Sequence, residues 1–267
     1  MLRSRILTAI VLGALLVALL RYSSPRVAGV ALGLIVLVGA WEWSAFLRLR
    51  APPARAAYVL VLLALALLGQ WGLVASGPFR LLIELTLAWW LAAFAWVLFA
   101  PTRASVAGAA VAGVLTLVPA WLVLVRIHST WPRGGEWTLF ILLLAFAADT
   151  GAFFAGRRFG RVRLAPRVSP GKTWEGVLGG MLAALAVGWA GARWFAQPAR
   201  AFVPLCLAAA AASVVGDLTE SLLKRSAGLK DSGRLFPGHG GVLDRIDSVT
   251  AAAPVMAAGL MWLGVGA

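Results

Sequence analysis

The stretch Ala201–Leu223 reads AFVPLCLAAAAASVVGDLTESLL, and its first 16 residues carry no charged side chain. An α-helix rises about 1.5 Å per residue, so roughly 20 apolar residues cross the ~30 Å hydrocarbon core of a bilayer. Asp217 lies inside the run, where a carboxylate costs about 2.5–3.5 kcal/mol and usually faces a partner or a cavity. The stretch therefore predicts a membrane-spanning helix with a polar site on one face.

Eight further apolar runs lie along the chain. With the first, the nine runs are Ile6–Leu20, Val27–Leu47, Ala56–Val74, Leu81–Ala100, Ala104–Val125, Trp137–Ala155, Gly176–Phe195, Ala201–Leu223 and Ile246–Gly266. They predict an all-α, polytopic membrane protein with about nine transmembrane helices in one membrane domain, residues 1–267. Seven of the ten acids and all three lysines lie at or after position 149. We therefore interpret 1–136 mainly as helical scaffold and 137–267 as the part that bears the site.

The composition excludes several classes of protein. Hydrophobic residues make up 61% of the chain and charged residues only 13%, whereas a soluble domain has about a quarter charged. The net charge of +14 would suit nucleic-acid binding on a soluble fold, but here the basic residues lie between apolar runs. A single cysteine, Cys206, excludes an intramolecular disulfide or a cysteine-cluster metal site.

The distribution of Lys and Arg predicts the orientation in the membrane. Arg3 and Arg5 before the first run also suit a cleaved signal peptide, but no Ala-x-Ala site follows, so we expect a retained helix. With nine helices, 17 of the 24 basic residues fall on the side of the N-terminus. Basic loops stay in the cytoplasm. The N-terminus and the two longest polar loops, Gly156–Glu175 and Lys224–Arg245, are therefore predicted to be cytoplasmic.

Two segments near the C-terminus collect side chains suited to a metal–polyphosphate. Asp217, Ser221 and Lys224 are spaced i, i+4 and i+7, so they share a helix face. An ion pair of Asp217 with Lys224 or a neighbouring arginine is the structural alternative. The loop that follows mixes carboxylates, cations, a histidine and glycines up to Asp244 and Asp247. Carboxylates hold Mg²⁺ with substrate phosphates, and cations neutralise phosphate oxygens.

Asp149 and Lys172 extend this polar region. Asp149 lies about two turns inside the sixth run, and we expect it to converge with Asp217 in one pocket, an ion pair with an arginine being the alternative. Gly171-Lys172-Thr173 lacks the upstream glycine of a P-loop, because Pro166 stands there. We interpret this segment as a loop entering the seventh helix, with Lys172 free to reach a phosphate.

These segments also carry a family resemblance. The run from Ser221 to Asp247, S-L-L-K-R-x(4)-K-D-x(5)-P-G-H-G-G-V-L-D-R-I-D, resembles the signature of phosphatidate cytidylyltransferases (CDP-diacylglycerol synthases). Asp149 and the stretch SPGKTWEG at 169–176 are similar to a second family block, and Trp41-Glu42-Trp43 is a third, shorter match. Gly171 is a departure, since the family more often has Lys or Asn there. As an alternative, Trp41 and Trp43 suit an interfacial aromatic belt.

The resemblance implies Mg²⁺-dependent transfer of CMP from CTP to phosphatidic acid in phospholipid biosynthesis, by a dimeric multi-pass enzyme of the cell membrane with its site facing the cytoplasm. It implies Asp217 and Asp244 as metal ligands, with a monovalent cation beside Mg²⁺. The implied catalytic residues are Lys224, Arg225, Lys230, Asp231, His239, Arg245 and Asp247. The implied substrate-binding residues are Asp149, Lys172 and Ser221.

Two other functions suit parts of the pattern. A CTP-dependent polyprenol or phytol kinase would transfer the γ-phosphate and release CDP instead of pyrophosphate. A cation-coupled transporter would use buried Asp149 and Asp217 as relays, but transporters commonly show matching halves, and here the acids and lysines concentrate in one half.

Overall fold

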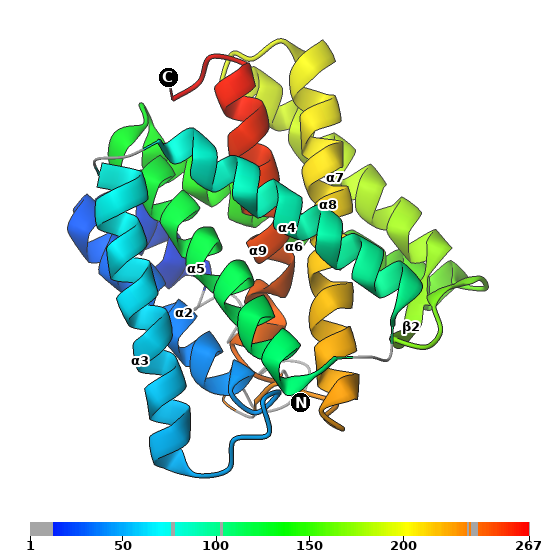
Figure 1. Cartoon of the computed structure of the whole chain (residues 1–267). Helices are drawn as coiled ribbons and strands as arrows, with labels where there is room; N and C mark the ends of the chain where they lie inside the picture. Colours follow the sequence, from blue (N-terminus) through cyan, green and yellow to red (C-terminus); the bar gives the residue numbers. More distant parts are fainter. Residues whose placement is uncertain (1–12, 76–77, 102–103, 234, 236–239, 267) are drawn as a thin grey trace.

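The structure is a computed structural model that describes residues 13–75, 78–101, 104–233, 235 and 240–266 (Figure 1). A short helix, Gly13–Tyr22, comes first. The further helices are α2 (Pro25–Trp43), α3 (Pro52–Gly69) with a π-helical turn η1 (Gln70–Ala75), α4 (Phe79–Phe99), α5 (Val106–Thr130), α6 (Gly134–Phe159), α7 (Trp174–Trp194), α8 (Ala199–Ser226) and α9 (Leu243–Trp262). Between α6 and α7 lie two strands, β1 (Arg163–Ala165) and β2 (Ser169–Thr173).

Seven of the described helices, α2 to α8, are long and apolar enough to cross a membrane. This agrees with a helical membrane protein. The predicted count of nine is not confirmed: the first predicted run lies partly outside the described residues, and its described part forms only the short helix. Helix α9 has sufficient length but is less apolar, because its first turns contain Asp244, Arg245 and Asp247. The cytoplasmic N-terminus also stays a prediction.

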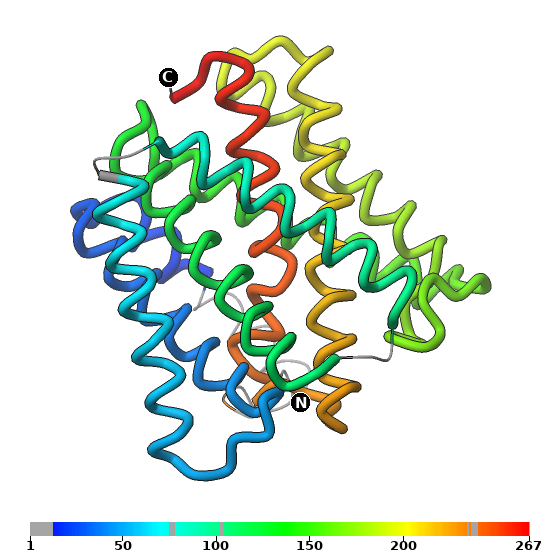
Figure 2. The backbone as a smooth tube through the Cα atoms, in the orientation of Figure 1, coloured from blue at the N-terminus to red at the C-terminus, as the bar shows by residue number. Residues whose placement is uncertain are grey.

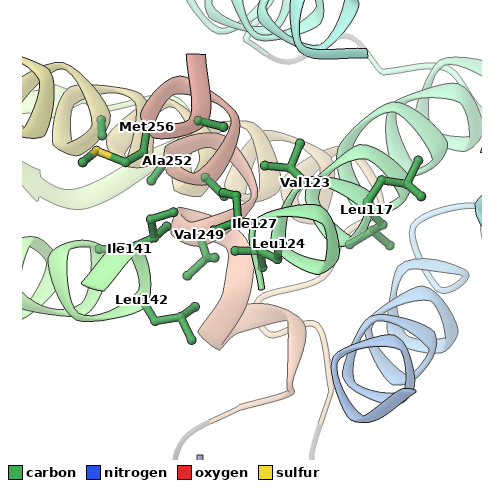
Figure 3. Packing of buried hydrophobic residues seen from close by; sticks show 14 of the residues in the cluster. Leu117, Val123, Leu124, Ile127, Ile141, Leu142, Val249, Ala252 and Met256 are labelled. Carbon is green, nitrogen blue, oxygen red and sulfur yellow. The ribbon is translucent and has the colours of Figure 1, made fainter. Parts of the chain in front are cut away.

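Helix α9 lies in the middle of the bundle, where it contacts α2, α4, α5, α6 and α8 (Figures 1 and 2). Figure 3 shows Val249, Ala252 and Met256 of α9 in one buried cluster with side chains of α5 and α6. A helix enclosed by protein can carry polar groups, because they meet partners instead of lipid. This central position therefore explains how α9 accommodates a charged first turn.

Helices α6 and α7 approach closely through glycines. A Cβ on Gly151 would lie 2.6 Å from the carbonyl oxygen of Gly179, and one on Gly180 would lie 2.8 Å from that of Ala148. Small residues let membrane helices pack backbone to backbone. The contact fixes the start of α7 beside the part of α6 that carries Asp149.

The segment before α7 is a β-hairpin, where the sequence predicted a loop in an all-α protein. Strands β1 and β2 pair antiparallel, with Arg163 opposite Thr173 and Ala165 opposite Ser169. The Thr173 side chain then caps α7 by accepting a hydrogen bond from the Gly176 amide at 3.1 Å. Strands this short and rich in charge carry no readable alternation of apolar and polar residues. The hairpin projects Lys172 toward α8.

Candidate active site

A cavity of about 470 Å³ lies between α6, the hairpin, α7, α8 and the start of α9. It brings together residues that lie up to about a hundred positions apart in the sequence. Seven of the predicted site residues line it: Asp149, Lys172, Asp217, Lys224, Asp244, Arg245 and Asp247. Arg157 of α6 lines the cavity as well; from the sequence it was interpreted only as one of the basic residues that set the orientation in the membrane. The predicted convergence of α6, α8 and α9 on one polar pocket is therefore present in the fold.

Asp217 forms an ion pair with Lys172 of the hairpin. Its Oδ1 also lies 3.4 Å from the Ser221 hydroxyl, one turn along α8. Lys172 is thus paired with Asp217 in this structure, and its predicted contact with a phosphate stays a prediction. The sequence also allowed a purely structural ion pair of Asp217 with Lys224 or a neighbouring arginine. The observed partner is Lys172 instead, because the hairpin folds back over α8.

Lys224 is a buried cation between two carboxylates. Its Nζ lies 2.7 Å from Asp244 Oδ1 and 3.0 Å from Glu220 Oε1, and its side chain is only 10% exposed. The sequence assigned no role to Glu220. The i, i+4 spacing of Glu220 and Lys224 on one helix was the available signal. Lys224 therefore connects α8 to the first turn of α9.

Asp244 has a dense set of donors. Besides Lys224, its Oδ2 accepts hydrogen bonds from the Gly241 amide at 2.8 Å, the Ser232 hydroxyl at 2.8 Å and the Ser232 amide at 3.1 Å. Burial raises the pKa of the Asp244 carboxyl, but Lys224 and these donors outweigh burial and hold the pKa below its ordinary value. Asp244 is therefore an anion at neutral pH, as a metal ligand must be.

Asp149 and Asp247 meet at Ser248, a residue that the sequence did not single out. The Ser248 hydroxyl lies 2.6 Å from Asp149 Oδ2 and 3.3 Å from Asp247 Oδ1, and the Ser248 amide donates to Asp247 Oδ1 at 2.8 Å. This contact joins α6 to α9 in the wall of the cavity. The structural alternative for Asp149 was an arginine partner, and the observed hydrogen bond runs to a serine instead.

Three described residues of the predicted catalytic set do not line the cavity. Arg225, Lys230 and Asp231 are exposed and absent from the described lining. Arg225 follows Lys224 by one position, so it points about 100° away around the helix, and it donates to the Leu229 carbonyl at 3.2 Å. His239 lies outside the described residues. A catalytic role for these residues stays a prediction.

The donor set suits a magnesium ion that arrives with a polyphosphate. Within the described residues, no three His, Cys, Asp or Glu side chains are grouped so as to hold a metal by themselves. Asp217 and Asp244 nevertheless line the same cavity. Mg²⁺ usually binds one or two carboxylates, and waters and substrate phosphates complete its shell. The residues present therefore fit Mg²⁺ in company with substrate better than a metal in an all-protein cage.

An apolar groove of about 400 Å³ adjoins the polar cavity. Leu164, Val177 and Val214 line both spaces. The rest of the groove is mainly apolar and comes from α4, α7, α8 and the hairpin, with Arg167 as its charged member. A ligand with a phosphate head and a hydrocarbon tail would find suitable surroundings for each part across this boundary.

Comparison with known proteins agrees with the family resemblance of the sequence. Residues 3–263 match the sequence profile of the Cytidylyltransferase family. The chain belongs to this family, as its motifs predicted. It is 41% identical to a phosphatidate cytidylyltransferase of Pseudomonas aeruginosa over 100% of both chains. It is 39% identical to a phosphatidate cytidylyltransferase of Haemophilus influenzae over 95% of this chain and 96% of that protein. A third protein of that name, from Brucella suis, is 48% identical over 47% of each chain.

Proposed function

We propose that this protein is a Mg²⁺-dependent phosphatidate cytidylyltransferase, which transfers CMP from CTP to phosphatidic acid and yields CDP-diacylglycerol and pyrophosphate. The observation that carries the proposal is the convergence of Asp217 and Asp244 with Lys172, Lys224 and Arg245 on one cavity that adjoins an apolar groove. The names of the full-length relatives support the same reaction.

The chemistry of the reaction explains why the cavity is rich in charge. A phosphate oxygen of the lipid is already an anion, so it attacks the α-phosphorus of CTP without a side-chain nucleophile. The new bond joins that oxygen to the α-phosphorus, and the bond from the α-phosphorus to the bridging oxygen breaks, so that pyrophosphate leaves in line. Catalysis then consists of positioning two polyanions and stabilising charge on the leaving group.

In this proposal, the cationic residues of the cavity bind phosphates and the carboxylates bind the metal. Lys172, Lys224 and Arg245 neutralise phosphate oxygens, and Lys172 exchanges its partner Asp217 for a phosphate when substrate binds. Asp217 and Asp244 would hold Mg²⁺, which would supply further positive charge at the triphosphate when bound. The monovalent cation implied by the family would lie next to this site.

The acyl chains of phosphatidic acid occupy the apolar groove in this proposal. Val214→Trp, at the boundary between groove and cavity, should raise the KM for phosphatidic acid roughly tenfold, the scale of a pocket contact, and leave the KM for CTP within about twofold. Leu182→Trp on α7 is the matched control, since Leu182 is exposed and lines neither space. Steady-state kinetics in mixed micelles measure both constants, and an unchanged lipid KM in Val214→Trp would remove the groove from the lipid path.

We also propose that the protein is a homodimer of the cell membrane whose cavity opens to the cytoplasm. The excess of Lys and Arg on the predicted cytoplasmic side supports this orientation. A cysteine at the exposed Arg161 should react with a membrane-impermeant thiol reagent in inside-out vesicles and stay unreactive in intact cells, and the native Cys206 is buried. The opposite pattern would invert the orientation, and a monomeric mass after purification in detergent would contradict the dimer.

Product analysis with CTP labelled at the α-phosphate tests the function. The label should enter a lipid that runs as CDP-diacylglycerol, pyrophosphate should appear in equal amount, and no label should stay on the protein. Labelled CDP as the product would indicate the kinase alternative. Lack of any turnover, combined with cation flux in proteoliposomes, would indicate the transporter.

A further inference from the structure

Glu42 belongs to the half of the chain predicted to be scaffold, yet it lies against the loop that leads into α9. It is the penultimate residue of α2 and only 6% exposed. Figure 2 shows the end of α2 and the start of α9 at the same end of the molecule. A buried carboxylate needs hydrogen-bond donors or a cation, so the groups that bond to Glu42 indicate which segment it positions.

The partners of Glu42 are the first amides of α9. Glu42 Oε1 accepts from the Val242 amide at 3.1 Å, and Oε2 accepts from the Leu243 amide at 2.8 Å. The first amides of a helix have no partner within the helix, and the N-cap residue of α9, Val242, has no side chain that could bond them. Glu42 therefore caps α9 from another helix and places a negative charge at the positive end of its dipole.

Glu42 is also linked to Asp244. The Ser232 hydroxyl lies 3.2 Å from Glu42 Oε2 and 2.8 Å from Asp244 Oδ2, and Ser232 itself is buried. Two glycines make room for the Glu42 carboxylate: a Cβ on Gly233 would lie 2.2 Å from Oε1, and one on Gly241 would lie 2.3 Å from Oε2. The described residues on both sides of the loop thus pack against this side chain.

The end of α2 is itself well anchored. Trp43 is 1% exposed, and its indole nitrogen donates to the Ala109 carbonyl of α5 at 2.8 Å. On the other side, Arg55 donates to the Trp41 carbonyl and to the Ser44 hydroxyl, both at 2.7 Å. Because the end of α2 is held in place, Glu42 fixes the position of the start of α9 relative to α2 and α5.

From these contacts we propose that Glu42 is a positioning residue for nucleotidyl transfer: by capping α9 and ordering the loop through Ser232, it sets the orientation of the Asp244 carboxylate. The inference rests on the proposed function, in which Asp244 holds the metal–nucleotide. Glu42 touches neither substrate nor metal and acts only through the position of Asp244.

The test uses the full-length protein and Glu42→Gln, which keeps the size of the side chain but turns one acceptor into a donor facing a backbone amide. Loss of a helix cap raises the equilibrium constant for local opening of the first helical turn about tenfold. Hydrogen exchange of the Val242 and Leu243 amides should therefore accelerate about tenfold. The Mg²⁺ concentration for half-maximal activity should rise, and kcat should fall, each roughly tenfold. The KM for phosphatidic acid should stay within about twofold. Glu84→Gln is the control, because Glu84 is an exposed carboxylate on α4 that pairs with Arg80.

The outcomes separate this inference from the function on which it rests. Unchanged amide exchange would show that Glu42 does not cap α9 and would overturn the proposal. Faster exchange with unchanged Mg²⁺ dependence would make Glu42 a purely structural residue and would overturn it as well. If the wild-type protein forms no CDP-diacylglycerol, the proposed function fails, whereas the exchange measurement still reports on the cap.

Discussion

Asp244→Asn is expected to abolish CMP transfer, with a fall in kcat of about a thousandfold or more. The carboxylate lies at the junction of Lys224, the Gly241 amide and both donors of Ser232. In an asparagine, an NH2 group replaces one of the two oxygens and faces either Lys224 or the Gly241 and Ser232 donors, which then lose their acceptor. The substitution also removes the negative charge that a metal ligand needs. Removal of a single well-placed electrostatic contact in an active site lowers kcat about a hundred- to a thousandfold, and the proposed metal binding would be lost in addition.

Turnover with CTP and phosphatidic acid measures this effect, and Glu84→Gln again serves as a carboxylate-to-amide control on the exposed face of α4. Folding of the variant is checked by its thermal unfolding in detergent. A correctly folded Asp244→Asn protein with wild-type kcat and unchanged Mg²⁺ dependence would remove Asp244 from the metal site.

The sequence predicted which side chains meet in one cavity where the partners share a helix or a motif. Asp244 and Asp247 are three positions apart at the start of α9, and Asp217 and Lys224 are seven apart on α8, so helical geometry alone places each pair on one face. All four line the cavity. The apolar lengths likewise predicted the helical membrane class, because bilayer thickness acts on each helix separately.

The contacts that the sequence missed depend on tertiary structure. Lys172 reaches Asp217 only because a short hairpin folds back over α8. Glu42 accepts from backbone amides some two hundred positions away, and a backbone amide has no signature in the sequence. Lys230 and Asp231 match the motif but are exposed and do not line the described cavity, because a motif records spacing and not the direction of side chains in a loop. Their catalytic role stays a prediction.

The charges of the cavity also explain why neither lysine is free. Lys172 pairs with Asp217, and Lys224 pairs with Asp244 and Glu220. Each proposed metal ligand thus has a lysine partner. In the proposed function, Asp217 and Asp244 would hold the metal and Lys172 and Lys224 would bind phosphates, so each of these charges would keep a counterpart when substrate binds. This exchange favours a substrate that brings both signs of charge.

Lys224→Met is expected to lower both stability and activity, and a second substitution separates the two effects. Without the ammonium group, Glu220, whose side chain is 2% exposed, and Asp244 face each other without compensation. Breaking a buried ion pair by removing one partner costs about 3–5 kcal/mol, so the midpoint of thermal unfolding in detergent should fall by several degrees.

The double variant Lys224→Met/Glu220→Gln removes one of the stranded charges and should recover most of the lost thermal stability. Its kcat should nevertheless stay about a hundred- to a thousandfold below wild type, because the cation that faces the phosphates is still missing. Glu220→Gln alone shows how much of any loss comes from the second position. Recovery of turnover together with stability would show that Lys224 only neutralises Glu220, and the phosphate-binding role would then pass to Lys172 and Arg245.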